Sequence, residues 1–393
     1  MPLAHGREYL AIPGPSVMPE AVLRAMHRSA PNIYEGELVE MTAGLIPDLK
    51  SFVGTEGHVA IYIANGHGTW EAALSNVLSR GDKVLVAATG LFAKGWAEMA
   101  AGLGIEVELM DFGTDTVIDP DRVAQRLRDD PDHSLRAVLA VHTDTSSSLR
   151  SDMGALGAAI RDTGHPALFM VDCIASLGCD VVEMDAWQAD VLISASQKGL
   201  MVPPGLGFVW FNDRADSARD RADLASHYWD WRPRANATQL WQYFDGTAPT
   251  HHLYGLRAAL DLIAAEGRAA IWHRHEVLAR TVWSAAEAWG AGGALRLNVA
   301  EPAHRSHAVT TLHLPGGGAS RLREWCASHA GVTLGIGLGF EPADDTFRIG
   351  HMGHVNAHMV LGVLAVIEAG LIACDIPHGG GALTAAAQVV ASA

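Results

Sequence analysis

Residues Ala189–Phe211 read ADVLISASQKGLMVPPGLGFVWF. The apolar run Val191–Ile193 predicts a buried strand, and Lys198 follows it among small residues. Pro203-Pro204-Gly205 predicts a rigid turn, after which Gly207–Phe211 returns as an antiparallel strand. Lysine is rarely buried without a partner, because its ammonium loses hydration there. Lys198 is therefore either a surface loop residue or an amine that carries chemistry.

A second apolar run favours the chemical interpretation. Leu168–Val171 predicts another buried strand, and Asp172 stands at its carboxyl end. Pyridoxal phosphate needs such a pair, because the carboxylate keeps the pyridine nitrogen protonated and the lysine forms the Schiff base. We therefore predict Asp172 and Lys198 as the catalytic pair.

The same motifs carry a resemblance to a known family. They resemble the fold-type I, class V aminotransferases, and within them the alanine/serine–glyoxylate aminotransferase group, from about Ile12 to about Ala369. The resemblance implies an α/β fold whose large domain is a mostly parallel, seven-stranded sheet wrapped by helices, with a smaller C-terminal α/β domain. The expected boundaries are an arm at 1–16, a large domain at 17–260 and a small domain at 261–393. The motifs are Ser196-Gln197-Lys198-Gly199, Pro203-Pro204-Gly205, Val171-Asp172, Ala175-Ser176-Leu177-Gly178 and Phe347–Gly353.

The composition agrees with a large globular enzyme. A chain of 393 residues with 49% hydrophobic residues can bury the cores of two domains. Its net charge of −16 argues against nucleic acid and anionic membranes as partners. The four cysteines lack the spacing of a disulfide framework or a metal site, and no long apolar run predicts a membrane span. We expect a cytoplasmic protein without a metal.

The rest of the chain alternates between strand and helix patterns. Residues Met1–Ser16 show no periodicity and predict an arm without a regular element. The alternation that follows, with strands expected to be buried on both faces, predicts a mostly parallel sheet. The predicted strands are Val59–Ile63, Lys83–Ala87, Val107–Asp111, Ala137–Val141, Ala308–Leu314 and Gly331–Ile336, and the predicted helices start near Pro19, Trp70, Pro120, Leu256, Ile271 and Met359.

A glycine-rich turn, Ala64–Thr69, separates a predicted strand from a helix. Free backbone N–H groups and the helix dipole make such a turn suitable for a phosphate, although a plain tight turn fits the local sequence as well. A dinucleotide site fits less well, because the spacing is not G-x-G-x-x-G. The resemblance implies that Gly66, His67 and Gly68 hold the cofactor phosphate.

The resemblance also implies further cofactor contacts. Phe92 would stack on the pyridine ring, although taken alone it is more typical of a core residue. Thr145 would place its hydroxyl near the ring oxygen, in a loop where Ser148 replaces an expected glycine. Gln197 belongs to the same site, and Thr247 would reach across a homodimer to the neighbouring phosphate, so that active sites are completed at the interface.

Substrate contacts are expected at two places. Arg348 can grip a carboxylate with two parallel hydrogen bonds, although a surface salt bridge is the simpler interpretation without the family. In relatives a basic and aromatic segment shapes the substrate pocket, where this chain has Asn32, Tyr34 and Glu35. Tyr34 is our candidate there.

The predicted reaction moves an amino group from serine, alanine or aspartate to a small 2-oxo acid, most favourably glyoxylate. A cysteine desulfurase would need a reactive thiol, but Cys326 lies in a helical pattern. A pyridoxamine–pyruvate aminotransferase would need a second arginine, which the loop Gly335–Gly339 lacks. Only the glycine-rich turn at Gly66 supports the alternative of a nicotinamide dehydrogenase. A non-catalytic regulator would need a DNA-binding module, and no basic helix-turn-helix pattern appears.

Overall fold

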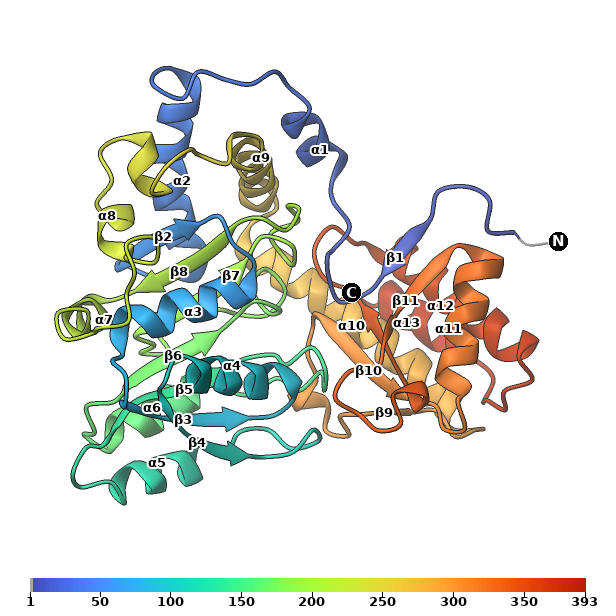
Figure 1. The fold of residues 1–393 in the computed structure, drawn as a ribbon. Helices are drawn as coiled ribbons and strands as arrows, with labels where there is room; N and C mark the ends of the chain where they lie inside the picture. The colour runs from blue at the N-terminus through green and yellow to red at the C-terminus, as the bar shows by residue number, and fades with distance from the viewer. Residues whose placement is uncertain (1–2) are drawn as a thin grey trace.

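The computed structural model describes residues 3–393. Figure 1 shows two lobes, and each is built on one β-sheet. The sheet of the larger lobe has seven strands in the order β2-β8-β7-β6-β5-β3-β4. Its strands are β2 (His58–Tyr62), β3 (Lys83–Ala88), β4 (Glu106–Asp111), β5 (Leu135–Val141), β6 (Leu168–Asp172), β7 (Val191–Ala195) and β8 (Gly207–Phe211).

The large sheet is mostly parallel, as predicted. Strands β4, β3, β5, β6 and β7 are parallel neighbours, and β8 runs antiparallel between β7 and β2. Every residue of β6, β7 and β8 is buried, because one apolar core lies on each face of the sheet. The expectation of burial on both faces is wrong for β4, whose residues are exposed or half-buried. This strand forms the edge of the sheet, so no neighbour covers its outer side.

Helices follow most of the predicted patterns. The helix predicted from Trp70 begins earlier, at Gly66, so the glycine-rich turn is its first turn rather than a loop. A long helix after Gly36 was not predicted. The helices of the larger lobe are α1 (Glu20–Met26), α2 (Glu37–Val53), α3 (Gly66–Val77), α4 (Leu91–Gly102), α5 (Pro120–Arg128), α6 (Met153–Asp162), α7 (Asp213–Ala218), α8 (Trp231–Ala235) and α9 (Thr250–Glu266).

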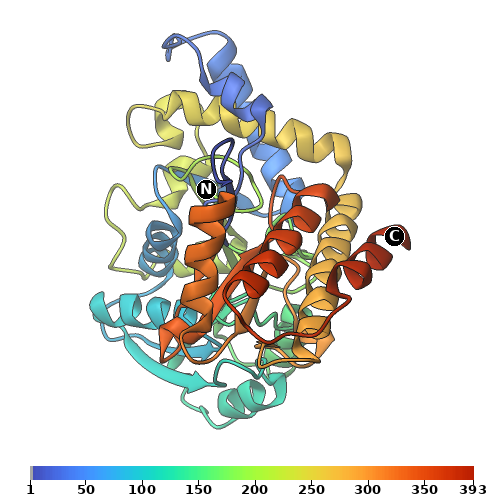
Figure 2. The ribbon, with the colours of Figure 1, turned by 90° about the vertical axis from the view of Figure 1, so that its right-hand side faces the viewer.

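The smaller lobe holds a five-stranded sheet in the order β1-β11-β12-β10-β9. Helices α10, α11 and α12 share one apolar core with this sheet and lie in front of it in Figure 2. Its elements are α10 (Arg268–Gly290), β9 (Arg296–Leu297), β10 (Val309–His313), α11 (Gly318–Ala330), β11 (Val332–Ile336), β12 (Thr346–Gly350), α12 (Ala357–Ala373) and α13 (Ala382–Ala391).

The N-terminal arm contains a strand, which corrects the sequence prediction. Residues Tyr9–Ala11 form β1 and pair in parallel with Val332–Leu334 of β11. Three residues are too few to show an alternating pattern, and their strand geometry comes from the neighbouring strand. The arm therefore belongs to the sheet of the smaller lobe, while the boundaries at 16 and 260 stay predictions. Within residues 3–393, no helix has the length and apolar character needed to cross a membrane.

Candidate active site

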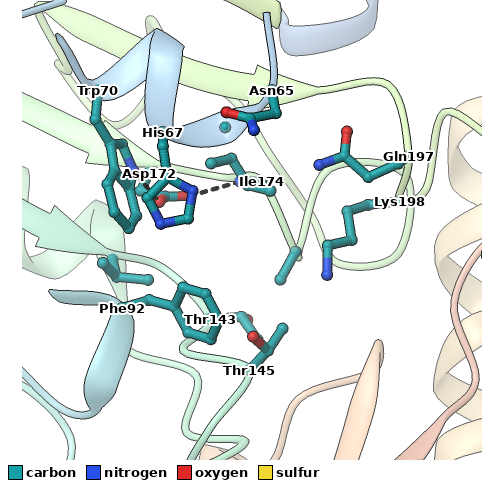
Figure 3. Close-up of a pocket in the computed structure, with 13 residues that line it drawn as sticks. Asn65, His67, Trp70, Phe92, Thr143, Thr145, Asp172, Ile174, Gln197 and Lys198 are labelled. Atoms are coloured by element: carbon teal, nitrogen blue, oxygen red, sulfur yellow. Dashed lines mark hydrogen bonds between the residues drawn. The ribbon is translucent and has the colours of Figure 1, made fainter. Parts of the chain in front are cut away.

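The main candidate site is a pocket at the carboxyl ends of β5, β6 and β7. Parallel strands end at the same sheet edge, so the loops that follow them meet there. In Figure 3 Lys198 and Gln197 enter the pocket from one side, and Trp70, His67 and Phe92 from the other. The lining residues are Asn65, Gly66, His67, Trp70, Phe92, Val141, Thr143, Thr145, Asp172, Ile174, Ala175, Gln197 and Lys198.

Asp172 is the last residue of β6 and is almost fully buried. Its Oδ1 accepts a hydrogen bond from the Ile174 backbone N–H at 2.7 Å, and its Oδ2 accepts one from Trp70 Nε1 at 2.6 Å. Burial raises the pKa of Asp172 to about 7, while these two donors and the charge of Lys198 lower it. The carboxyl group therefore stands near its titration midpoint at neutral pH.

Lys198 follows β7 and directs its amine into the same pocket. Burial lowers the pKa of Lys198 to about 8, and the positive charge of Arg348 acts in the same direction. The N-terminal arm passes directly beside this side chain, since Lys198 Nζ donates to the Pro13 carbonyl. Ser16 Oγ also donates to the Lys198 carbonyl at 2.6 Å.

Gly14 lets the arm come this close. Its φ of 97° lies in the left-handed region that favours glycine. A Cβ atom at this position would stand 2.5 Å from Lys198 Nζ. A side chain at residue 14 would therefore displace either the arm or the end of the Lys198 side chain.

The first turn of α3 forms one wall of the pocket. Asn65 caps this helix, because its side-chain oxygen accepts a hydrogen bond from the Gly68 N–H at 3.2 Å. Gly68 does not line the pocket, and its amide is already used by this cap. The His67 ring packs against Trp70, with ring centroids 4.6 Å apart. Gly66 and His67 thus stand at a helix N-terminus, where the dipole favours an anion.

Phe92 reaches the pocket from the first turn of α4. Asp144, in the loop after β5, is fully buried and accepts hydrogen bonds from the N–H groups of Phe92, Ala93 and Ser146, at 2.9, 3.2 and 2.9 Å. These bonds fix the start of α4 and hence the position of Phe92. The local expectation of a core residue holds only in part, because Phe92 packs against the apolar core but is half-buried and also lines the cavity.

The hydroxyl-rich loop after β5 supplies both Thr143 and Thr145 to the pocket. The hydroxyl of Thr143 is buried and has no hydrogen-bond partner among the described residues. Ser148 has a φ of 61°, so it takes the left-handed conformation that the expected glycine would adopt easily. The loop keeps this shape without glycine, and Ser148 Oγ accepts a hydrogen bond from the Thr311 N–H at 3.1 Å.

Arg348 lies on β12 and reaches the site from the smaller lobe. It is 6% exposed, so the interpretation as a surface salt bridge is wrong. Its Nε donates to the Ile336 carbonyl at 2.7 Å, and its Nη1 donates to the Thr145 carbonyl at 2.9 Å. Burial lowers the pKa of Arg348 to about 10, which leaves the guanidinium charged at neutral pH. No hydrogen bond within residues 3–393 uses Nη2.

Four predicted residues do not line the pocket, namely Gly68, Arg348, Thr247 and Tyr34. Thr247 is exposed, and Tyr34 is 87% exposed. Neither lines the cavity of its own chain. Cys326 lies in α11, fully buried, and burial raises its pKa to about 12, as the interpretation of an inert thiol expects.

Sequence patterns did not single out Asn65, Trp70 or Thr143 as site residues. Trp70 fits the apolar helical pattern of α3, so its hydrogen bond to Asp172 has no signal in the sequence. Asn65 directly before the first helical residue is a typical N-cap, and this signal could have placed the helix start correctly.

The fold and the pocket together define a class of protein. A mostly parallel seven-stranded sheet, a smaller α/β lobe and a lysine–aspartate pair at the strand ends are features of the fold-type I aminotransferases. The match to the class-V aminotransferase family model covers residues 9–343. The chain therefore belongs to the class-V aminotransferases.

Individual relatives cover nearly the whole chain. It is 37% identical to a serine–glyoxylate aminotransferase of Methylorubrum extorquens over 93% of this chain and 92% of that protein. It is 34% identical to an L-aspartate–glyoxylate aminotransferase of Paracoccus denitrificans, over 96% and 94% of the two chains. The crystal structure of a ureidoglycine–glyoxylate aminotransferase from Bacillus subtilis is similar with a TM-score of 0.88 and 27% identity, over 99% of each chain. The predicted fold and family are thereby confirmed.

Proposed function

We propose that this aminotransferase uses pyridoxal phosphate bound at Lys198, and that it transfers the amino group of a small amino acid to glyoxylate. The observation that carries the proposal is the pairing of Lys198 and Asp172 in one pocket. Burial lowers the pKa of Lys198 to about 8 and raises that of Asp172 to about 7. Strongly shifted pKa values in a pocket mark functional groups.

The residues present fit the cofactor. Gln197 Oε1 and Thr143 Oγ1 are buried and have no hydrogen-bond partner among residues 3–393, and both residues line the pocket. Buried polar atoms are rarely left unsatisfied, so these two favour a polar ligand. The aldehyde, pyridine and phosphate of pyridoxal phosphate match an amine, a carboxylate and a helix N-terminus.

Each predicted cofactor residue has a task in this proposal. Lys198 binds the aldehyde, and Asp172 accepts a hydrogen bond from the protonated pyridine nitrogen. Phe92 packs on the ring, and Thr145, with Thr143 beside it, supplies a hydroxyl for the ring oxygen. Gly66, His67 and Gln197 would hold the phosphate at the start of α3, and Gly68 supports this turn through its hydrogen bond to the Asn65 cap.

The bound cofactor supplies an electron sink for the carbanion at the amino acid Cα. Once the amine of the amino acid has taken its place on the aldehyde, the released Lys198 amine would accept the proton from Cα and then give up a proton in turn, which requires that the amine is neutral. A pKa of about 8 leaves a useful fraction of the amine neutral near pH 7. Asp172 keeps the ring cationic. Arg348 binds the α-carboxylate, since no hydrogen bond within residues 3–393 uses its Nη2.

A homodimer would complete the site. Thr247 is exposed, consistent with a contact to the phosphate of a second chain, and Tyr34 at 87% exposure would line the neighbouring substrate pocket. We propose both contacts, together with the domain division at residues 16 and 260.

Glyoxylate is the favoured acceptor because the loop Gly335–Gly339 supplies no second cation beside Arg348. A dicarboxylate such as 2-oxoglutarate would leave one carboxylate unpaired, which is costly in a buried site. The relatives named for serine–glyoxylate and aspartate–glyoxylate transfer support the same acceptor. Serine, alanine and aspartate stay open as donors.

The test is a pair of half-reactions. The chain loaded with pyridoxal phosphate should absorb in the visible range, and Lys198→Ala should lack this band. Serine, alanine or aspartate should bleach the band, and glyoxylate should restore it with a larger kcat/KM than pyruvate or 2-oxoglutarate. Absence of the band in the wild type would refute the cofactor, and a larger kcat/KM for 2-oxoglutarate would refute the acceptor. Turnover of free pyridoxamine with pyruvate would instead support the pyridoxamine–pyruvate alternative.

A further inference from the structure

Trp70 contacts the carboxylate at the centre of the site. Its side chain is 1% exposed and lines the pocket beside Asp172. The indole Nε1 donates to Asp172 Oδ2 at 2.6 Å, and the Ile174 backbone N–H donates to Oδ1 at 2.7 Å. Among residues 3–393 each carboxylate oxygen thus has one donor, one from α3 and the other from the turn after β6. The orientation of the carboxylate therefore depends on both.

We propose that Trp70 is a positioning residue, which favours the ionised form of Asp172 and directs this carboxylate at the cofactor through its indole hydrogen bond. The inference rests on the proposed function, because it assumes that Asp172 accepts from the pyridine nitrogen. A donor to a carboxylate stabilises the charged form. Trp70 thereby opposes the effect of burial on this group.

The Trp70 ring also packs against two other residues proposed to contact the cofactor. Its centroid lies 4.6 Å from that of His67 and 6.5 Å from that of Phe92, with tilted and edge-on geometry. One side chain thus touches the residues assigned to the phosphate, the ring face and the ring nitrogen. A shift of this indole would change all three contacts.

Other charged groups around Asp172 do not replace the indole. Lys198 favours the ionised carboxylate across the pocket, and Asp144 opposes it from the loop after β5. The neighbouring Cys173 stays a neutral thiol, because burial raises its pKa well above the usual range. The carboxylate has two hydrogen-bond donors within the described residues, and Trp70 is the one that a substitution can remove.

Trp96 offers a matched control. It is fully buried and stacks on Trp70 with centroids 6.2 Å apart, but its Nε1 has no partner among the described residues. Trp70→Phe and Trp96→Phe therefore remove the same volume from one aromatic cluster. Only Trp70→Phe removes a hydrogen bond to Asp172.

The experiment measures the dissociation constant of pyridoxal phosphate against pH for the wild type and both variants. Affinity should fall as the pH drops through the pKa of Asp172, because the protonated acid no longer accepts from the ring N–H. Loss of a hydrogen bond to a charged group should move the midpoint of this fall upward by about one to two pH units in Trp70→Phe. Trp96→Phe should keep the wild-type midpoint.

Equal midpoints in the two variants would overturn the role of Trp70, even if both bind more weakly. A wild type that binds no pyridoxal phosphate would instead overturn the proposed function. If Trp70→Phe does not fold, indole ¹⁵N labelling of the wild type replaces it. One indole N–H resonance should then titrate with the affinity midpoint and shift in Asp172→Asn, and the absence of such a resonance would refute the inference.

Discussion

Replacing Asp172 with asparagine should weaken cofactor binding, but it should make the fold relatively more stable as the pH rises towards 7. Burial raises the pKa of this carboxyl from 3.8 to about 7. The folded pKa is the higher one, so this group favours folding at low pH, and the advantage is lost as the pH rises to about 7. The contribution of Asp172 to the stability of the cofactor-free wild type should therefore fall by about 1.4 kcal/mol per pH unit in this window, or about 4 kcal/mol in total.

Asparagine carries no charge and should escape this loss. At low pH Asp172→Asn should be less stable than the wild type. The asparagine NH2 group cannot accept a hydrogen bond, so either Trp70 Nε1 or the Ile174 N–H would lose its acceptor. As the pH rises towards 7, the difference in Tm should move in favour of the variant. Cofactor affinity should fall by about ten- to 150-fold in Asp172→Asn, because a charge-assisted hydrogen bond contributes about 1.5–3 kcal/mol.

Thermal unfolding of the cofactor-free proteins in a pH series and absorbance titration with pyridoxal phosphate would measure both effects. Asp190→Asn is a suitable control, because Asp190 is fully buried beside β7 and pairs with Arg161 and Arg214 at 2.5 and 2.9 Å. It should lower the Tm without changing cofactor affinity. A Tm difference for Asp172→Asn that does not depend on pH would refute the buried-charge argument, and an unchanged dissociation constant would refute the nitrogen contact.

Three further predictions concern the amine, the arm and the carboxylate clamp. Borohydride reduction and peptide mapping should place the pyridoxyl mass on Lys198, and its presence on Lys83 or Lys94, which form salt bridges with acidic residues, would contradict the assignment. Gly14→Ala should weaken cofactor binding and lower kcat, because the added Cβ would stand 2.5 Å from the lysine amine and residue 14 has a φ of 97°, which favours glycine. Wild-type binding and turnover in this variant would show that the arm moves freely. Arg348→Lys should lower kcat/KM for glyoxylate by about ten- to 150-fold with an unchanged cofactor spectrum, since lysine cannot form two parallel hydrogen bonds, and an unchanged kcat/KM would place the clamp elsewhere.

The sequence predicted those features that depend on local pattern. Asp172 and Lys198 follow short, strongly apolar strands, and such strands end at one sheet edge whatever packs around them. The antiparallel return at Gly207–Phe211 followed from the proline-rich turn. These features need no knowledge of distant contacts.

The remaining features depend on tertiary contacts. Strand β1 exists because β11 offers a free edge, and Phe92 reaches the pocket because Asp144 fixes the start of α4. In the sequence Trp70 has the pattern of an apolar helical residue, and its role depends on the Asp172 carboxylate that β6 places beside it in the fold. Tyr34 and Thr247 are exposed in one chain, so their predicted roles need a second chain as well.

The two central groups explain why cofactor binding and fold stability should be coupled. In the cofactor-free pocket, burial disfavours both the ammonium of Lys198 and the carboxylate of Asp172. An aldehyde ligand removes the cost of burying the Lys198 ammonium, because the amine is then bound as an imine and is no longer a free ammonium. A protonated ring nitrogen lowers the cost of burying the Asp172 carboxylate, because it gives this carboxylate a cationic partner. A ligand with only one of these groups relieves only one cost and should bind more weakly, so at equal concentration pyridoxal phosphate should raise the Tm more than a phosphate ester without the aldehyde.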